Sequence, residues 1–154
     1  MYSICDTHQR SALCHNIDIS KNEIITAATG NRIKKYRLLA GLKQEELSKI
    51  SGVHRTHIIK LENNMQILSL DICNKLAKAL NIKPEILMND YLKFISSNYG
   101  QAIKESRTEL KLTRENLSIL LGVHVGTIKR WENNEAAPSR DNFNLINRYM
   151  NFKY

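Results

Sequence analysis

The chain has 154 residues, a formal net charge of +8 and three irregularly spaced cysteines. An odd number of cysteines argues against a disulfide framework and for a reducing cytosol, and the lack of any run of about 18 apolar residues excludes a membrane-spanning helix. The charge is −1 over residues 1–30, +6 over residues 31–98 and +3 over residues 99–154, so the basic part of the chain suits a polyanionic partner.

In chain order, the polar residues 1–21 are interpreted as a tail or a loosely docked arm, and helical patterning begins near Ile24 and Ile25. The next helix is expected to end at Gly41, because glycine is typical of the position just after a helix. The remaining helices of this half are predicted over Gln44–Ser51 (with Leu47 and Ile50 on its inner face), His54–Glu62, Ser69 or Leu70 to Leu80, and residues 84–88.

Residues 89–98 are apolar enough to pack, and they predict a semi-rigid helical connector rather than a flexible linker. The second half repeats the plan, with helices predicted over Gln101–Leu110, Arg114–Leu121, His124–Glu132, and Pro138 or Ser139 to Met150. Because no segment shows the sustained alternation of a strand, the predicted fold class is all-α.

Residues 33–64 and 103–134 form an internal repeat. They align without a gap at an offset of 70 residues, and 14 of the 32 positions are identical, whereas unrelated segments would share about two. The repeat divides the chain into a tail of residues 1–21, a first domain of residues 22–90 and a second domain of residues 91–154.

Each repeat meets the requirements of a helix-turn-helix. A glycine, Gly52 or Gly122, allows the tight turn between two short helices. Apolar residues then fix the angle between the helices, which leaves a polar outer face on the second one. The fixing residues are Leu47, Val53, Ile58 and Leu61 in the first repeat and Leu117, Val123, Ile128 and Trp131 in the second.

The strings QEELSKISGVHRTHIIKLENN and GVHVGTIKRWENNEAAP resemble the lambda-repressor-like family, the phage repressor/Cro or XRE type of helix-turn-helix. The resemblance covers most of the chain. It implies two tandem domains of this family, joined by the short helical connector, each of which places its third helix in the major groove of double-stranded DNA.

The resemblance also implies roles for single residues. It assigns phosphate anchoring to Gln44 and Arg114, the start of the recognition helix to His54 and His124, and contact with the DNA backbone to Asn63 and Asn133. It assigns base-edge contacts to Arg55, Thr56 and Lys60, and their counterparts are Val125, Gly126 and Arg130. His57, Thr127 and Lys129 lie on the same outer faces and complete the predicted DNA-binding set.

The two predicted reading faces differ in chemistry. Arg55 can form a bidentate pair with guanine, worth about 1–3 kcal/mol of discrimination. Val125 suits only a thymine methyl group, and Gly126 offers no side chain and costs about 1 kcal/mol of helix stability relative to alanine. The second repeat is therefore expected either to bind mainly phosphate, through Arg114, Thr127, Lys129 and Arg130, or to contact protein.

Other residues are assigned to the framework. The resemblance implies that Arg37 pairs with Glu62, and Arg107 with Glu132, to tie the first helix of each repeat to the third. Cys73 and Trp131 occupy inward helical positions and are expected in the core. Cys5, His8, Cys14 and His15 have no standard zinc spacing, so no metal and no cofactor is predicted.

No catalytic nucleophile with its base and no phosphate loop is present, so an enzyme is not expected. The predicted function is a sequence-specific DNA-binding transcriptional repressor in the cytoplasm of a bacterial or phage-type system, associated with the nucleoid. The predicted partners are double-stranded DNA and a second copy of the chain. The alternative is an interaction module, such as an antitoxin-like adaptor, in which the second domain binds a protein or mediates dimerisation.

Overall fold

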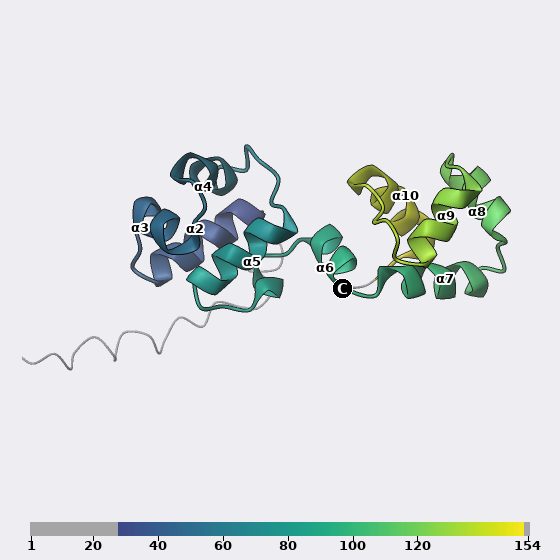
Figure 1. Ribbon diagram of the computed structural model, residues 1–154, viewed down its shortest axis with the longest axis horizontal. Coiled ribbons are helices and arrows are strands. Elements are labelled where there is room, and N and C mark those ends of the chain that lie inside the picture. Colours follow the sequence, from purple (N-terminus) through teal and green to yellow (C-terminus); the bar gives the residue numbers. More distant parts are fainter. Residues whose placement is uncertain (1–27, 153–154) are drawn as a thin grey trace, which may run out of the picture.

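The computed structural model describes residues 28–152. The predicted tail, the onset of helical patterning near Ile24 and the cysteines and histidines at positions 5–15 lie outside the described residues. Within the described range all regular structure is helical, arranged as two bundles on either side of a short helix, α6 (Asp90–Ser96) (Figure 1). None of the described helices is long and apolar enough to cross a lipid bilayer.

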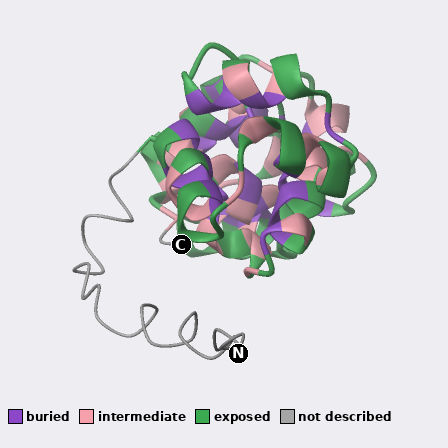
Figure 2. Cartoon of the chain, turned by 90° about the vertical axis from the view of Figure 1, so that its left-hand side faces the viewer, coloured by how far each residue is buried: buried purple, intermediate pink, exposed green. Residues whose placement is uncertain are grey.

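The first bundle contains α2 (Thr29–Leu39), α3 (Gln44–Ser51), α4 (Arg55–Glu62), α5 (Leu70–Ala79) and the 3₁₀ helix η1 (Pro84–Ile86). Its core is a cluster of fully buried aliphatic side chains, with at least one from each α-helix, including Ile33, Leu47, Ile58 and Leu76. Seen end-on, the buried residues lie on the inner sides of the helices and the exposed residues on the outer sides (Figure 2). The amphipathic spacing read from the sequence therefore defines the interior of this bundle.

The second bundle repeats this order with α7 (Tyr99–Glu109), α8 (Arg114–Leu121), α9 (Val125–Glu132) and α10 (Arg140–Met150). Its core is more aromatic, because Phe94, Trp131 and Phe143 are buried beside Ile103 and Ile146. Cys73 and Trp131 are both buried, as predicted.

Polar residues fix where most of these helices begin. The side chains of Ser69, Asn98, Thr113 and Ser139 accept hydrogen bonds from backbone N–H groups three residues along, at the starts of α5, α7, α8 and α10. Such a cap satisfies a donor that the helix itself cannot, and is worth about 1 kcal/mol. Because Asn98 caps α7, this helix starts two residues before the predicted Gln101.

A glycine in each bundle permits a close helix-to-chain approach. A Cβ atom on Gly30 would lie 2.2 Å from the carbonyl oxygen of Leu61, and one on Gly100 would lie 2.6 Å from that of Glu132. The amide of Gly30 donates to the side chain of Asn64, and that of Gly100 to Asn134, both at 3.0 Å. The repeat thus extends to the starts of α2 and α7, where glycine brings the first helix onto the end of the third.

Helix α6 belongs to both cores. Its Leu92 is buried in the core of the first bundle, whereas its Phe94 is buried in the core of the second. Tyr91 and Ile95 pack against both. The connector is therefore a helix, as predicted, and its alternating apolar faces join two hydrophobic cores.

Two local predictions were wrong. Ile50 is 59% exposed rather than inward, because the inner stripe of α3 follows positions 47, 48 and 51, an i, i+1, i+4 pattern also seen at 117, 118 and 121 of α8. Residues 84–88 form only a three-residue 3₁₀ helix. The carbonyl groups of Leu87 and Met88 accept hydrogen bonds from Arg32 instead of continuing a helix.

Candidate nucleic-acid interface

Gly52 and Gly122 form the turns between the second and third helices. Both adopt the left-handed backbone conformation, with φ of +68° and +64°, and both lie directly after the end of a helix. A residue with a Cβ atom is strained in this conformation, so glycine sets the sharp change of direction. The turn holds α4 close to α3 and α9 close to α8.

Apolar side chains fix the angle at each turn. Leu47, Ile58 and Leu61 are at most 2% exposed in the first bundle, and Leu117, Ile128 and Trp131 are at most 2% exposed in the second. Dense packing of this kind resists rotation of the helices relative to each other. The outer faces of α4 and α9 are therefore presented by a rigid support.

The outer face of α4 carries the first set of predicted DNA-binding residues. Arg55, Thr56 and Lys60 are exposed, and so are His54 before the helix and Asn63 after it. The Nδ1 atom of His54 lies 2.8 Å from the hydroxyl oxygen of Thr56, which orients both side chains at the start of the helix. His57 is half-buried, and its Nε2 atom is enclosed without a hydrogen-bond partner. Its side chain is therefore less accessible to a ligand than those of Arg55 and Thr56.

The outer face of α9 differs. Lys129, Arg130 and Asn133 are exposed, whereas Val125 and Thr127 are half-buried. The side chain of His124 caps the helix by accepting a hydrogen bond from the amide of Gly126 at 3.0 Å. The charged residues of this face are thus at its C-terminal end, and the N-terminal end has no exposed side chain with hydrogen-bonding groups for a base edge other than His124.

Gln44 and Arg114, the predicted phosphate anchors, contact a buried glutamate. The amide nitrogen of Gln44 donates to Glu62 at 2.8 Å, and Nε of Arg114 donates to Glu132 at 2.7 Å. The predicted ion pairs are also present, since Nε of Arg37 lies 2.6 Å from Glu62 and Nε of Arg107 lies 2.6 Å from Glu132. The terminal amino groups of Arg114 remain able to donate elsewhere, because a guanidinium has five N–H donors.

Each glutamate is a buried carboxylate at the centre of a polar cluster, in which Arg37 or Arg107 is also buried and Gln44 or Arg114 is partly exposed. Burial by itself raises the pKa of Glu132, but hydrogen bonds from Arg107 and Arg114 outweigh it and hold the pKa below its ordinary value of 4.5. The hydrogen bond to Glu62 raises the pKa of Arg37. The carboxyl group of Glu132 is therefore ionised at neutral pH, and each cluster ties the first, second and third helices of its bundle together.

Residues at the junction between the bundles were not among those predicted from the sequence. Arg140 of α10 donates to the carbonyl group of Leu68, in the first bundle, at 2.9 Å. The hydroxyl group of Tyr91 donates to the carbonyl group of Pro138 at 3.1 Å. The signal that could have found Arg140 is its position in the repeat, since the equivalent residue at an offset of 70 is the apolar Leu70.

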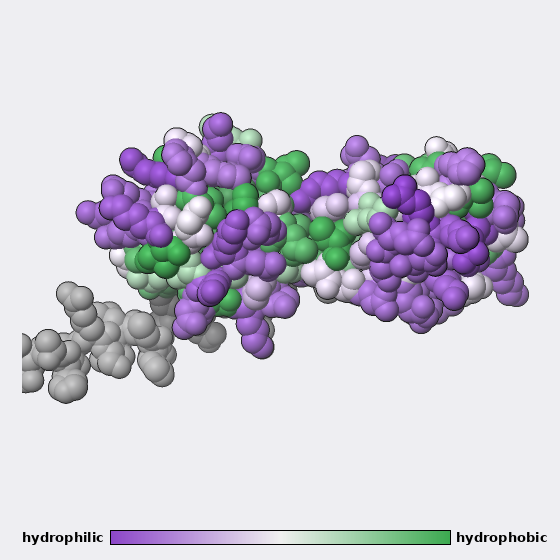
Figure 3. Space-filling view, in the orientation of Figure 1, coloured by the Kyte–Doolittle hydropathy of each residue, from purple (hydrophilic) through white to green (hydrophobic). Residues whose placement is uncertain are grey.

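No cluster of histidine, cysteine, aspartate or glutamate suitable for a metal ion occurs among residues 28–152. On the face shown in Figure 3, hydrophilic residues cover most of both bundles, and hydrophobic residues appear between them. This face of the molecule is therefore mainly hydrophilic, with hydrophobic residues exposed where the two bundles meet.

A helix-turn-helix family model matches the chain twice, over residues 33–87 and 103–153. Control protein C.SmaI of Serratia marcescens is 40% identical over 62 residues, which are 40% of this chain and 74% of that protein. Control protein C.BamHI of Bacillus amyloliquefaciens is 33% identical over 61 residues, which are 39% of this chain and 75% of that protein. An uncharacterized HTH-type transcriptional regulator of Methanocaldococcus jannaschii is 42% identical over 55 residues, 36% of this chain and 83% of that protein.

Among solved structures, the restriction-modification controller protein C.AhdI from Aeromonas hydrophila is 33% identical, with a TM-score of 0.39, and covers 44% of this chain and 98% of its own. Each of these relatives thus matches a segment about as long as one bundle. The family model, in contrast, matches both bundles. The chain therefore belongs to the helix-turn-helix family of DNA-binding transcriptional regulators, of the lambda-repressor-like type, with the domain present twice and with similarity to the control proteins C.SmaI and C.BamHI.

Proposed function

We propose that the chain is a sequence-specific repressor that binds double-stranded DNA and reads the major groove with α4 and α9. The observation that carries this proposal is the outer face of α4. Arg55, Thr56 and Lys60 are exposed there, on a helix whose inner side is held by the fully buried Ile58. A side chain that reads a base must be presented in one orientation, and a rigid support provides that orientation.

The proposed roles differ between the bundles. Arg55 pairs with a guanine, Thr56 and Lys60 contact neighbouring bases or phosphates, and His54, Gln44 and Asn63 position α4 on the DNA backbone. In the second bundle Lys129, Arg130, Arg114 and Thr127 bind phosphates, with Asn133 and His124 beside them, and Val125 contacts a thymine methyl group. The first bundle then supplies most of the sequence discrimination, and the second supplies mainly charge.

Selection of bound duplexes from a random library, followed by titration of the selected sequence, tests the proposal. Replacement of Arg55 by alanine is expected to weaken binding to the selected duplex by about 5–150-fold and to relax the preference at one base pair. Glu45→Gln, an exposed change on α3, serves as a control that leaves the preference unchanged. Full affinity and unchanged preference in both Arg55→Ala and Lys60→Ala would contradict the role of the first bundle.

The process that we propose is control of a restriction-modification locus. It is supported by the similarity to the control proteins C.SmaI and C.BamHI, each of which is matched over about three quarters of its length. A reporter carrying DNA upstream of the gene and its neighbours tests both the process and the sign of regulation. Repression that depends on Arg55, at a site beside a restriction or methylation gene, is the expected result.

One observation favours a second function for the second bundle. Helix α8 exposes Ile119 by 79% and Leu120 by 41%, close to a recognition helix that carries few base-reading groups. Exposed apolar residues of this kind suit contact with protein, either a second copy or another chain. Ile119→Lys, which installs the residue of the equivalent position Lys49, is expected to abolish such contact and to leave DNA affinity unchanged. Light scattering across a concentration series distinguishes the two functions.

A further inference from the structure

The two DNA-reading bundles are linked by more than the continuity of the chain. Leu92 and Phe94 of α6 are each at most 1% exposed, although they lie in the cores of different bundles. Tyr91 packs edge-on against Phe143 of α10, with ring centroids 5.6 Å apart. A helix whose side chains fill two cores cannot rotate freely with respect to either of them.

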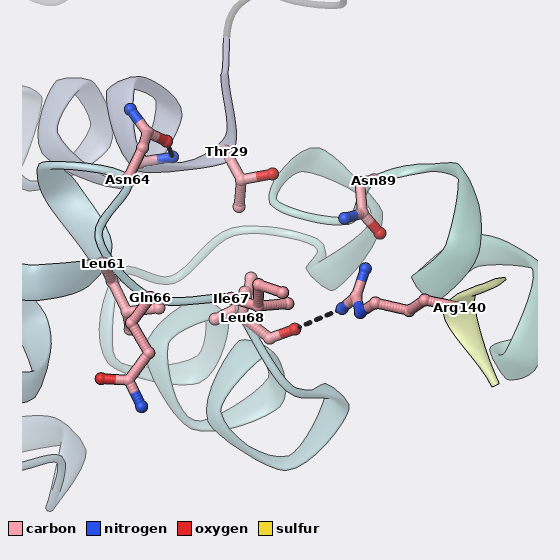
Figure 4. A pocket seen from close by; sticks show the side chains of 9 residues that line it. Thr29, Leu61, Asn64, Gln66, Ile67, Leu68, Asn89 and Arg140 are labelled. Atoms are coloured by element: carbon pink, nitrogen blue, oxygen red, sulfur yellow. Dashed lines mark hydrogen bonds between the residues drawn. The ribbon is translucent and has the colours of Figure 1, made fainter.

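Arg140 spans the junction from the second bundle to the first. Its side chain extends from the start of α10 into a cavity of about 190 Å³ that is otherwise lined by residues of the first bundle and the connector, among them Asn64, Leu68 and Asn89 (Figure 4). The guanidinium donates to the carbonyl group of Leu68 at 2.9 Å, and its carbon lies 4.3 Å from the centre of the Tyr91 ring. This side chain of the second bundle therefore contacts both the first bundle and the connector.

The partners of Arg140 are unusual for a charged group. No carboxylate of the described residues pairs with it, and burial lowers its pKa. A partly desolvated guanidinium is held here by a backbone carbonyl and an aromatic face, and both contacts require one relative placement of the two bundles. The equivalent residue of the first bundle, Leu70, makes no such bridge.

A second arginine stiffens the same junction from the other side. Arg32 of α2 is 7% exposed and donates to the carbonyl groups of Leu87 and Met88, at 3.3 and 3.2 Å, immediately before α6. The equivalent position of the second bundle is Ala102. Arg32 thus binds the backbone where the chain passes from the first bundle into α6, which fixes the direction in which α6 leaves that bundle, whereas Arg140 binds the backbone at Leu68, between α4 and α5.

We propose that Arg140, with Tyr91, clamps the two bundles in one relative orientation, and that this clamp makes the chain selective for the spacing between two DNA half-sites. The selectivity for spacing rests on the proposed function, whereas the clamp itself does not. Two linked reading heads gain affinity from each other only when the link lets both engage at once. A rigid link therefore favours one spacing and disfavours a shift by half a helical turn, about 5 base pairs.

The clamp is tested without DNA by electron-spin distance measurements. Labels are attached at Lys34→Cys and Lys104→Cys, which are equivalent exposed positions on α2 and α7, in a Cys5→Ser, Cys14→Ser background. Cys73 is retained, because it is buried and burial raises its pKa to about 11. The unmodified junction is expected to give one narrow distance distribution, and Arg140→Leu to broaden it about twofold or more.

Three further variants control this measurement. Arg148→Leu removes the same charge from an exposed position of the same helix and is expected to leave the distribution narrow. Arg140→Lys keeps a cation over Tyr91 and is expected to give a distance distribution narrower than that of Arg140→Leu. Tyr91→Phe loses the hydrogen bond to Pro138 and is expected to broaden the distribution less than Arg140→Leu does. Fluorescence of Trp131 confirms that the second bundle is folded in each variant.

Spacing selectivity is tested with duplexes in which two selected half-sites are moved apart in single base-pair steps over one helical turn. The original chain is expected to bind at least about tenfold less tightly when the half-sites are half a turn out of phase. Arg140→Leu is expected to reduce this contrast to about twofold, with unchanged affinity for a duplex that carries one half-site.

An unchanged distance distribution in Arg140→Leu would overturn the clamp, and an original chain indifferent to spacing would overturn its role in selectivity. If the library yields no bound duplex, the proposed function fails, but the distance distributions still decide whether the clamp exists.

Discussion

Glu62 and Glu132 occupy equivalent positions in the two bundles but are held by different partners. Glu62 is bound by one cation, Arg37, and by the neutral amide of Gln44. Glu132 is bound by two cations, Arg107 and Arg114. The cluster of the first bundle is therefore neutral and that of the second carries a net positive charge, although the surrounding backbone is the same.

The third helices of the two bundles also differ, in the residues that they offer to base edges. Helix α4 exposes Arg55 and Thr56, which can hydrogen-bond to base edges, and the equivalent positions of α9 hold Val125 and Gly126. The first bundle thus exposes more side chains that can hydrogen-bond to bases. The second has fewer such side chains but one more positive charge in the cluster around its glutamate. A shared framework of turn, apolar packing and ion pair therefore leaves both the charge and the base-contacting residues free to differ.

The largest expected difference concerns the glutamates. Glu132→Gln should lower the free energy of unfolding of the second bundle by about 3–5 kcal/mol, because it leaves the buried Arg107 and the partly exposed Arg114 without a carboxylate. Glu62→Gln, which leaves one, should cost the first bundle less. Urea unfolding followed by the fluorescence of Trp131, the single tryptophan of the chain, reports the second bundle, and circular dichroism reports both. An equal loss of unfolding free energy in the two variants would show that glutamine at position 44 and arginine at position 114 are energetically equivalent.

Acid should weaken the second bundle through Glu132. The pKa of this carboxyl group is lowered in the folded state from 4.5, so its stabilisation is complete above about pH 4.5 and is lost as the pH falls below that value. The urea midpoint reported by Trp131 should therefore decrease with pH in this range. In Glu132→Gln the decrease should be smaller, and an equally steep decrease would assign the effect to other groups.

An exchange of reading residues should reverse the difference between the helices. Val125→Arg with Gly126→Thr gives α9 the residues of α4, and should add about 1–3 kcal/mol of discrimination for a guanine in the second half-site. The reciprocal change, Arg55→Val with Thr56→Gly, should remove a similar amount from the first. Library selection with each variant measures both effects. No new preference after the first exchange would mean that α9 does not reach the bases.

The smallest expected difference lies in the salt dependence of DNA binding. Arg114→Gln gives the second bundle the residue found at Gln44, and should lower the slope of log affinity against log salt by about 0.9 if Arg114 neutralises one phosphate. Gln44→Arg should raise it by a similar amount. Titrations at four or five salt concentrations measure the slopes, and an unchanged slope in Arg114→Gln would confine Arg114 to its contact with Glu132.

Most of the fold follows from local pattern. Gly52 and Gly122 mark the turns, the apolar spacing marks the inner faces, and the 70-residue repeat shows that one plan is used twice. Ile50 shows the limit, because in a helix of eight residues a shift of one position decides whether a side chain faces the core or solvent. The predicted DNA-binding residues of α4 and α9 lie on common helix faces for the same local reason.

The all-α class, the tandem architecture and the different residues on the two predicted reading faces follow from the residues alone, and the resemblance to the family implied the paired Arg–Glu ties. The folded structure was needed to show that α6 fills both cores, that Gln44 and Arg114 contact the buried glutamates, and that Arg140 reaches Leu68 in the other bundle. The last of these contacts is drawn in Figure 4. The two groups of features differ in how far apart in the chain the interacting residues lie. Helices, turns and helix faces are set by residues within a few positions of each other. The hydrogen bonds of Gln44, Arg114 and Arg140, in contrast, join residues 18 to 72 positions apart and exist only once the bundles have packed.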